Sequence, residues 1–197
     1  MKRALLIVTG LVAAAVASGA DFLTDPAAAQ VISGGGGAGA SVASGAYWYS
    51  QTYPNTSVTG TGAETVLADV AIPANAIGPT GILRITTAWT ATNSANNKNL
   101  RGRFSSTANS TAGTQVHGVT SNTWAVLQTQ SIMRNANATG SQTSFNNGVN
   151  SYAAGSSTLV AASVDTTQVT HVTITGQLAL STETITLLGV TVEALRP

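Results

Sequence analysis

The stretch ILRITTAWT, residues 82–90, decides the fold of this chain. One set of alternate positions is mostly apolar and the other is polar or small: Leu83, Ile85, Thr87 and Trp89 against Arg84, Thr86 and Ala88. Alternation with a period of two is typical of a strand that buries one face and exposes the other. The stretch therefore predicts a half-buried β-strand with Arg84 on its outer face.

The same period of two recurs downstream, and no stretch after residue 47 keeps a helical period. The inward faces that it predicts are Leu100, Gly102 and Phe104; Trp124, Val126 and Ile132; Val172 and Ile174; and Leu188, Val190, Val192 and Ala194. Clusters of Gly, Pro and Asn separate these runs and mark turns. Residues 47–197 are therefore predicted to form one all-β domain, an antiparallel β-sandwich of jelly-roll type.

The first 46 residues differ in composition from the rest of the chain. Lys2 and Arg3 precede an uncharged run at residues 4–20, the order of charge and hydropathy found in a secretory signal peptide. A membrane anchor and a retained helix that attaches the chain to a partner are the alternatives, although the run is short for a bilayer span. We interpret residues 1–32 as an apolar, helical leader or attachment segment. Residues 33–46, rich in Gly, Ser and Ala, are predicted to be a flexible tether.

Composition excludes several functions. Only 8% of the 197 residues are charged, cysteine is absent and there are two histidines, so we expect no catalytic, cofactor-binding or metal-binding residues. A catalytic triad built on His117 or His171 with Asp165 carries no weight, because serine is so abundant that the combination arises by chance. The net charge of +1 provides no basic surface for nucleic acid, which we do not expect as a partner.

Aromatic side chains cluster where the predicted tether ends. Tyr47, Trp48, Tyr49 and Tyr53 are candidate interface residues, because Tyr and Trp join a large apolar face to a polar tip. Such residues pack against a neighbouring subunit or stack on the sugar rings of a glycan. Alternation on a first strand would bury Trp48 and expose Tyr47 and Tyr49.

Three arginines are the other candidate interface residues. Arg84, Arg101 and Arg103 occupy outward positions of predicted strands and could approach one another as a basic patch. Nearby carboxylates could balance this patch: Glu64, Asp69 or Glu193. One interpretation is a solvated face with weak ion pairs, and the other is a contact with a second subunit or a capsid, where arginine binds carboxylates through two hydrogen bonds.

Several segments resemble structural proteins of tailed bacteriophages. The resemblance begins in IPANAIGPTGILRI at residues 72–85 and continues through WT at 89–90, TNSANNK at 92–98 and RGRF at 101–104. It returns in DTT at 165–167, TITGQL at 173–178 and ETITL at 183–187. It spans roughly residues 60–195 and implies a compact β-sandwich carried on the virion, in a fibre, a spike or a capsid-decorating protein.

Two classes of function follow as expectations. In the first, the chain is a non-enzymatic virion protein whose N-terminal segment inserts into other virion proteins. Its β-domain associates with copies of itself as a homotrimer. The domain also contributes to host attachment, with a surface glycan as one partner. In the second, it is an exported bacterial lectin-like or adhesion domain, secreted or periplasmic after removal of its signal peptide.

Overall fold

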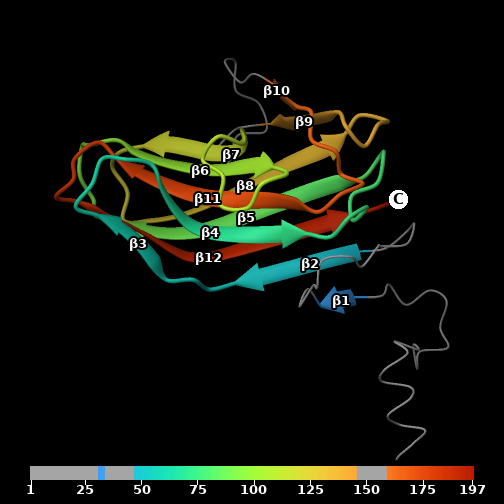
Figure 1. Ribbon diagram of the computed structural model, residues 1–197. Helices are drawn as coiled ribbons and strands as arrows, with labels where there is room; N and C mark the ends of the chain where they lie inside the picture. Colours follow the sequence, from blue (N-terminus) through green and yellow to red (C-terminus); the bar gives the residue numbers. More distant parts are fainter. Residues whose placement is uncertain (1–30, 34–46, 146–158) are drawn as a thin grey trace, which may run out of the picture.

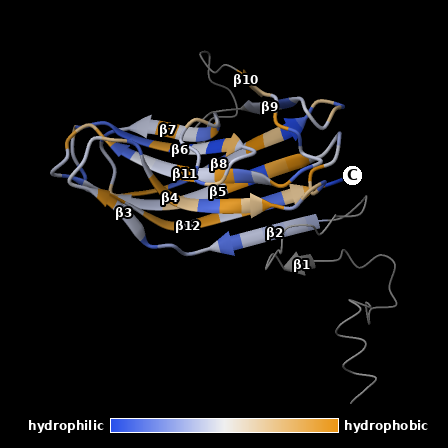
Figure 2. Cartoon of the chain, in the orientation of Figure 1, coloured by the Kyte–Doolittle hydropathy of each residue, from blue (hydrophilic) through white to orange (hydrophobic). Residues whose placement is uncertain are grey.

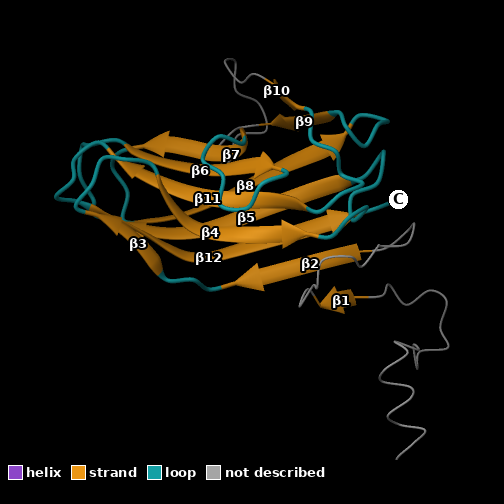
Figure 3. Ribbon diagram, viewed as in Figure 1, coloured by secondary structure: helices purple, strands orange, loops and turns teal. Residues whose placement is uncertain are grey.

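The computed structural model describes residues 31–33, 47–145 and 159–197 (Figure 1). Across these ranges the chain consists of strands joined by turns and loops, without a helix (Figure 3). The strands are β1 (Val31–Ser33), β2 (Tyr47–Thr52), β3 (Thr56–Thr59), β4 (Thr65–Ile72), β5 (Ile82–Ala91), β6 (Lys98–Ser105), β7 (Thr114–Ser121), β8 (Val126–Asn135), β9 (Gln142–Phe145), β10 (Leu159–Ala162), β11 (Thr170–Leu178) and β12 (Thr184–Leu195).

The strands form two sheets that pack face to face. The larger sheet has the order β1-β2-β12-β5-β8-β9-β10, with β3 also on β12, and the smaller has the order β4-β11-β6-β7. If β1, β3, β9 and β10 are set aside and the others are numbered 1 to 8 along the chain, the two sheets read 1-8-3-6 and 2-7-4-5. This is the order of a jelly roll, in which two Greek keys supply both sheets. The predicted fold class is confirmed.

The predicted N-terminal segments fall largely outside the described residues. This applies to the apolar leader and to most of the tether. β1 spans the boundary that we predicted between residues 32 and 33, and its backbone pairs in parallel with β2, in contrast to the antiparallel pairing of the other strands.

The core lies between the two sheets, and the alternation in β5 is confirmed. Leu83, Ile85, Thr87 and Trp89 are completely buried, while the residues between them keep part of their surface exposed. The inward residues of β6 and β11 are buried as predicted: Leu100, Phe104, Val172 and Ile174. Figure 2 shows hydrophobic residues spread along β4, β5 and β12, whereas β2 is mostly polar in colour.

The predicted inward face of β8 is wrong. Val126 is 74% exposed and Ile132 is only half-buried. The buried side chains of this strand are instead Thr129, Ser131, Met133 and Asn135. Polar groups of the core need hydrogen-bond partners, and the inward side chains of β8 supply them to His117 and to the loops at one end of the sandwich. An apolar pattern therefore does not mark the inward face of this strand.

The predicted inward face of β12 is wrong at one position. The register of β12 against β5 shifts between Leu187 and Gly189, which marks a β-bulge. A bulge inserts an extra residue into one strand and reverses the alternation beyond it. Val190 and Val192 are buried as predicted, but Leu188 is only half-buried, and Leu187 takes the inward position before the bulge.

The turn between β4 and β5 is built by backbone constraints. β4 ends at Ile72, directly before Pro73, which has no N–H to donate to a neighbouring strand. Gly78 adopts a positive φ of 67°, which glycine adopts without steric cost. A Cβ on Gly81 would lie 1.7 Å from the carbonyl oxygen of Ile77, so the chain can fold back here only because residue 81 has no side chain.

The first and last strands of the jelly roll lie side by side. Tyr47, at the start of β2, is the register partner of Leu195, at the end of β12. The chain therefore enters the domain and leaves it at the same end of the sandwich, close to the C label in Figure 1.

Candidate functional site

The predicted aromatic cluster separates into a buried residue and an outward row. Trp48 is 2% exposed and belongs to the core, so its indole is not on the surface. Tyr47 and Tyr49 are half-buried on the other side of β2, and Tyr53, just beyond the strand, is 69% exposed. The alternation that predicted these orientations is therefore correct.

Hydrogen bonds join the outward side chains of β2 into a row. The Tyr49 hydroxyl donates to the amide oxygen of Gln51, whose amide nitrogen donates to the Tyr53 hydroxyl. The rings of Tyr47 and Tyr49 are 6.4 Å apart between centroids, with an angle of 21° between their planes. We call Tyr47, Tyr49, Gln51 and Tyr53 the tyrosine row. We did not single out Gln51 from the sequence, although its place two residues after Tyr49 shows the same period of two.

One end of the row is bound to an ion pair on neighbouring strands. The Tyr47 hydroxyl donates to Glu193 on β12, and Glu193 also pairs with Arg84 on β5 at 3.3 Å. Partial burial and the adjacent Glu193 carboxylate raise the pKa of Tyr47 to about 12. Tyr47 therefore remains protonated and uncharged at ordinary pH.

Arg101 and Arg103 come together on the outer face of the smaller sheet. The Arg103 guanidinium donates from Nε to Glu64 Oε1 at 2.7 Å and from Nη2 to Oε2 at 2.8 Å, and Arg101 Nη1 lies 3.1 Å from Oε2. Thr175 on β11 donates to the same carboxylate at 2.6 Å. These contacts, above all the hydrogen bond from Arg103, hold the pKa of Glu64 below its usual value.

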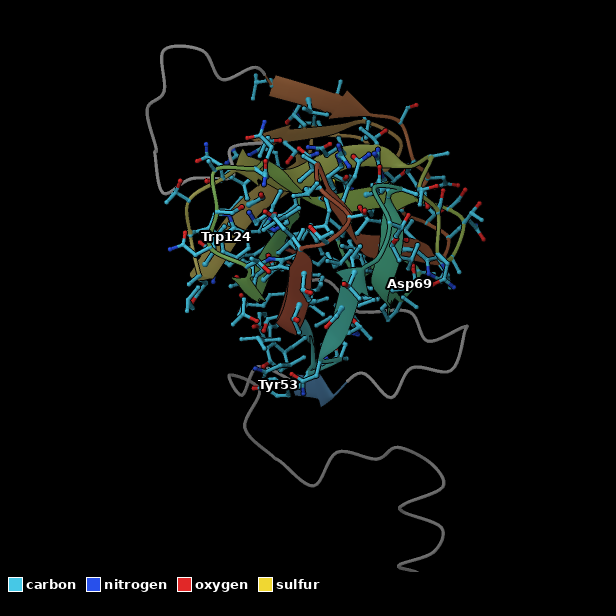
Figure 4. The ribbon with its side chains drawn as sticks, turned by 90° about the vertical axis from the view of Figure 1, so that its left-hand side faces the viewer. Tyr53, Asp69 and Trp124 are labelled. Atoms are coloured by element: carbon cyan, nitrogen blue, oxygen red, sulfur yellow. The ribbon has the colours of Figure 1, made fainter. Side chains whose placement is uncertain are left out.

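The predicted patch of three arginines does not form. Arg84 lies on the outer face of the larger sheet, whereas Arg101 and Arg103 lie on the outer face of the smaller one. In a sandwich these faces point in opposite directions. Glu64 and Glu193 do balance the arginines as expected, but Asp69 pairs with His171 at 2.7 Å. Figure 4 shows Asp69 on β4, away from Tyr53.

His117 lies completely buried between the two sheets. Its Nε2 is 2.9 Å from the hydroxyl oxygens of both Thr87 and Thr129, and its Nδ1 is 2.7 Å from the hydroxyl of Ser131. The Trp89 indole donates to the Thr87 hydroxyl at 2.7 Å. Burial lowers the pKa of His117 to about 4, so the ring is neutral at physiological pH and acts as a structural hydrogen-bonding group.

A buried ion pair that we did not predict ties together the loops at the end of the sandwich away from the C-terminus. The Lys98 ammonium is completely buried, 3.1 Å from Glu183 Oε2 and 2.8 Å from the Ser94 hydroxyl. It also donates to the carbonyl oxygen of Asn96 at 2.9 Å, while the Asn96 side chain donates to Glu183. Hydrogen bonds from Asn96 and Ser94, with the contribution of Lys98, lower the pKa of Glu183 to about 2. The rarity of lysine in the chain was the one available signal.

The carboxylates and histidines of the described residues hold strands and turns together. Each carboxylate and each histidine in this part of the chain has a hydrogen-bond or ion-pair partner on a neighbouring element or turn: Glu64, Asp69, His117, Asp165, His171, Glu183 and Glu193. No cluster of metal-binding side chains occurs among residues 31–33, 47–145 and 159–197. Nor does this part contain a helix that could cross a membrane.

Comparisons with known proteins place the chain in no family. No family model matches the sequence, and no curated protein matches it. Among solved structures, the chain is similar to the CBM2 module of the evolved Dit protein of Lactobacillus casei BL23 phage J-1, with a TM-score of 0.38 and 12% identity over 81% of this chain and 84% of the other. It is also similar to infectious bursal disease virus, Gx strain, with a TM-score of 0.30 and 11% identity over 77% of this chain and 41% of the other. Both TM-scores are too low to carry a functional argument.

Proposed function

We propose that this chain is a non-enzymatic virion structural protein that displays its jelly-roll domain on the particle surface and takes part in host attachment. The N-terminal segment holds it to other virion proteins, and the domain assembles with copies of itself. The observation that carries the proposal is the use of the ionisable side chains. Each described carboxylate and histidine is engaged in holding strands or turns together, which leaves none of these groups as an evident free acid or base for catalysis.

Two further observations support a place on a virion. The sequence resembles structural proteins of tailed phages in several segments, and most of these segments lie in or beside β5, β6, β11 and β12. The jelly roll is also a fold of viral capsid domains and of lectins. The fold contributes by analogy alone, because one fold serves many functions.

The test is to find the chain on particles. Antibody against residues 47–197 would be used to detect the protein in phage particles purified by density gradient, and intact-mass measurement would determine its N-terminus. We expect the protein to sediment with particles at a fixed copy number and to retain residues 1–20. A protein absent from particles would overturn the proposal.

An exported lectin-like or adhesion domain is the second candidate. It is favoured by Lys2 and Arg3 followed by the uncharged run at residues 4–20, the pattern of a secretory signal peptide. A mature chain that begins near Asp21 and is found in the periplasm or the medium would favour this candidate. The same mass measurement therefore separates the two.

A further inference from the structure

We propose that the tyrosine row is a binding surface for a neutral saccharide chain that lies along β2. This inference rests on the proposed display of the domain, because it names what the displayed face would bind. The row is not part of the core, and it contacts β12 at two places, through Tyr47 and Glu193 and through Tyr53 and Gly189.

The spacing of the row suits an extended ligand. Side chains on one face of a strand repeat about every 6.6 Å, and the ring centroids of Tyr47 and Tyr49 are 6.4 Å apart with nearly parallel planes. The two rings thus follow each other along the strand direction. Tyr53 extends the same line beyond the end of β2 and is 69% exposed.

The row is organised before any ligand arrives. Gln51 bridges the hydroxyls of Tyr49 and Tyr53, and Tyr47 is held by Glu193. The Tyr53 ring also rests against Gly189 on β12, since a Cβ at residue 189 would lie 3.4 Å from its Cδ1 and 3.5 Å from its Cε1. One side of the ring is therefore supported while most of its surface remains open. Side chains that are already ordered lose little entropy on binding.

The chemistry of the row matches a sugar. A pyranose ring has an apolar face of C–H groups, which packs on the negative face of an aromatic ring, and a rim of hydroxyls. The row offers tyrosine rings together with an amide and phenolic hydroxyls, which donate and accept hydrogen bonds. Each class of atom on a sugar thus finds a partner along a single strand.

The charge of this face favours a neutral ligand. Glu193, which accepts a hydrogen bond from Tyr47, pairs with Arg84 at 3.3 Å, so the two charges offset each other. Tyr47 stays protonated because its pKa is about 12. The clustered charges lie on the opposite face, where Arg101 and Arg103 flank Glu64. An anionic polymer would find no net positive charge at the row.

A second copy of the chain fits the row less well. The backbone of β1 already occupies the edge of β2 at Tyr47–Tyr49, so a copy cannot pair with β2 at these residues. The exposed polar atoms of the row are an amide and hydroxyls, whereas the centre of a stable homodimer interface is mainly apolar. Self-association through the row is nevertheless a measurable outcome of the test.

The test is binding of the isolated full chain to an array of neutral and acidic oligosaccharides, followed by calorimetric titration with the neutral oligosaccharide retained most strongly. We expect Tyr49→Ala and Tyr53→Ala each to weaken binding by about tenfold, as for an aromatic residue central to an interface. Gln130→Ala, on the same outer face but on β8, is the matched control and should leave the affinity unchanged. Tyr49→Phe, which keeps the ring, should lose less than Tyr49→Ala.

Several results would overturn the inference. They are no retention of any neutral oligosaccharide, retention of acidic ones alone, equal affinity in Tyr53→Ala and the wild type, or loss of self-association in the alanine variants without saccharide binding. Circular dichroism would verify that the variants fold, and all are surface substitutions. Failure of the proposed function gives a different result. If the protein binds saccharide through the row but is absent from particles, the virion assignment is refuted and this inference stands.

Discussion

Replacement of the buried His117 should change how stability depends on pH. The folded protein lowers the pKa of this histidine from 6.5 to about 4, whereas the unfolded chain gives it the ordinary value. Between these two pH values the unfolded state binds more protons, so the free energy of unfolding falls as the pH falls. At about 1.36 kcal/mol per pKa unit, the loss reaches about 3 kcal/mol below pH 4, of which about 2 kcal/mol has accrued at pH 5.

The measurement compares the wild type with His117→Gln by urea unfolding at several pH values from 7.5 to 5. The variant should be less stable at pH 7.5 by about 1–3 kcal/mol, because it disrupts hydrogen bonds with Thr87, Thr129 and Ser131. Between pH 7.5 and 5, however, the wild type should lose about 2 kcal/mol more than the variant. Other titrating groups are common to both proteins and cancel in this difference.

Equal losses in the two proteins over this range would refute the reasoning. They would mean that His117 titrates normally in the folded state, and hence that it is not shielded from water between the sheets. A nuclear magnetic resonance titration of the ring gives an independent reading. The His117 ring signals should stay constant down to about pH 5, because the pKa in the folded protein is about 4.

Three other substitutions test features of the fold. Lys98→Met should destabilise the protein by about 3–5 kcal/mol in urea unfolding, because it leaves the Glu183 carboxylate buried without its cation. The double variant Lys98→Met, Glu183→Gln should lose less stability than Lys98→Met alone, and a loss below about 1 kcal/mol in Lys98→Met would contradict the reasoning. Gly81→Ala should prevent folding as judged by near-ultraviolet circular dichroism, since its Cβ would overlap backbone atoms, whereas Gly140→Ala, with open space around it, should remain within about 0.5 kcal/mol of the wild type. Glu64→Gln should lower the free energy of unfolding by about 1–3 kcal/mol at pH 7, and this difference from the wild type should shrink as the pH falls through the lowered pKa of Glu64. A difference that stays constant down to pH 2 would contradict this role of the carboxylate.

The sequence predicts best where a strand buries apolar side chains on one face. The alternation of β5 was sufficient to place Leu83, Ile85, Thr87 and Trp89 in the core, and that of β2 to place Trp48 inward. In both strands the buried positions are the apolar positions of the sequence pattern. Thr87 is the single polar exception. Secondary structure and the jelly-roll class follow from such strands.

The sequence predicts poorly where the core itself is polar. In β8 the apolar Val126 points outward and Thr129, Ser131 and Asn135 point inward. Asn135 donates to the Thr166 hydroxyl at 2.9 Å, in the loop between β10 and β11. The need for an inward amide arises from that distant loop, so no local pattern reveals it.

The candidate site was predicted in part for a similar reason. Tyrosines that share one strand keep their relation wherever the strand lies, so the outward position of Tyr47 and Tyr49 was predictable. The relation between Arg84 and Arg101 depends on how β5 and β6 are distributed between the sheets. These strands are neighbours in the chain but belong to different sheets. The jelly-roll connections decide this placement, and the residues of either strand alone do not predict it.

The pairing of Tyr47 with Leu195 determines how the domain can be engineered. A fluorescent protein or an affinity tag fused after Pro197 would emerge beside the point at which the chain enters the sandwich, crowding whatever that end is attached to. The tip that points away from it is made by turns such as residues 93–97 and 179–183, which Lys98 and Glu183 brace from within. Foreign peptides intended for display belong in those turns, provided that the bracing pair is kept.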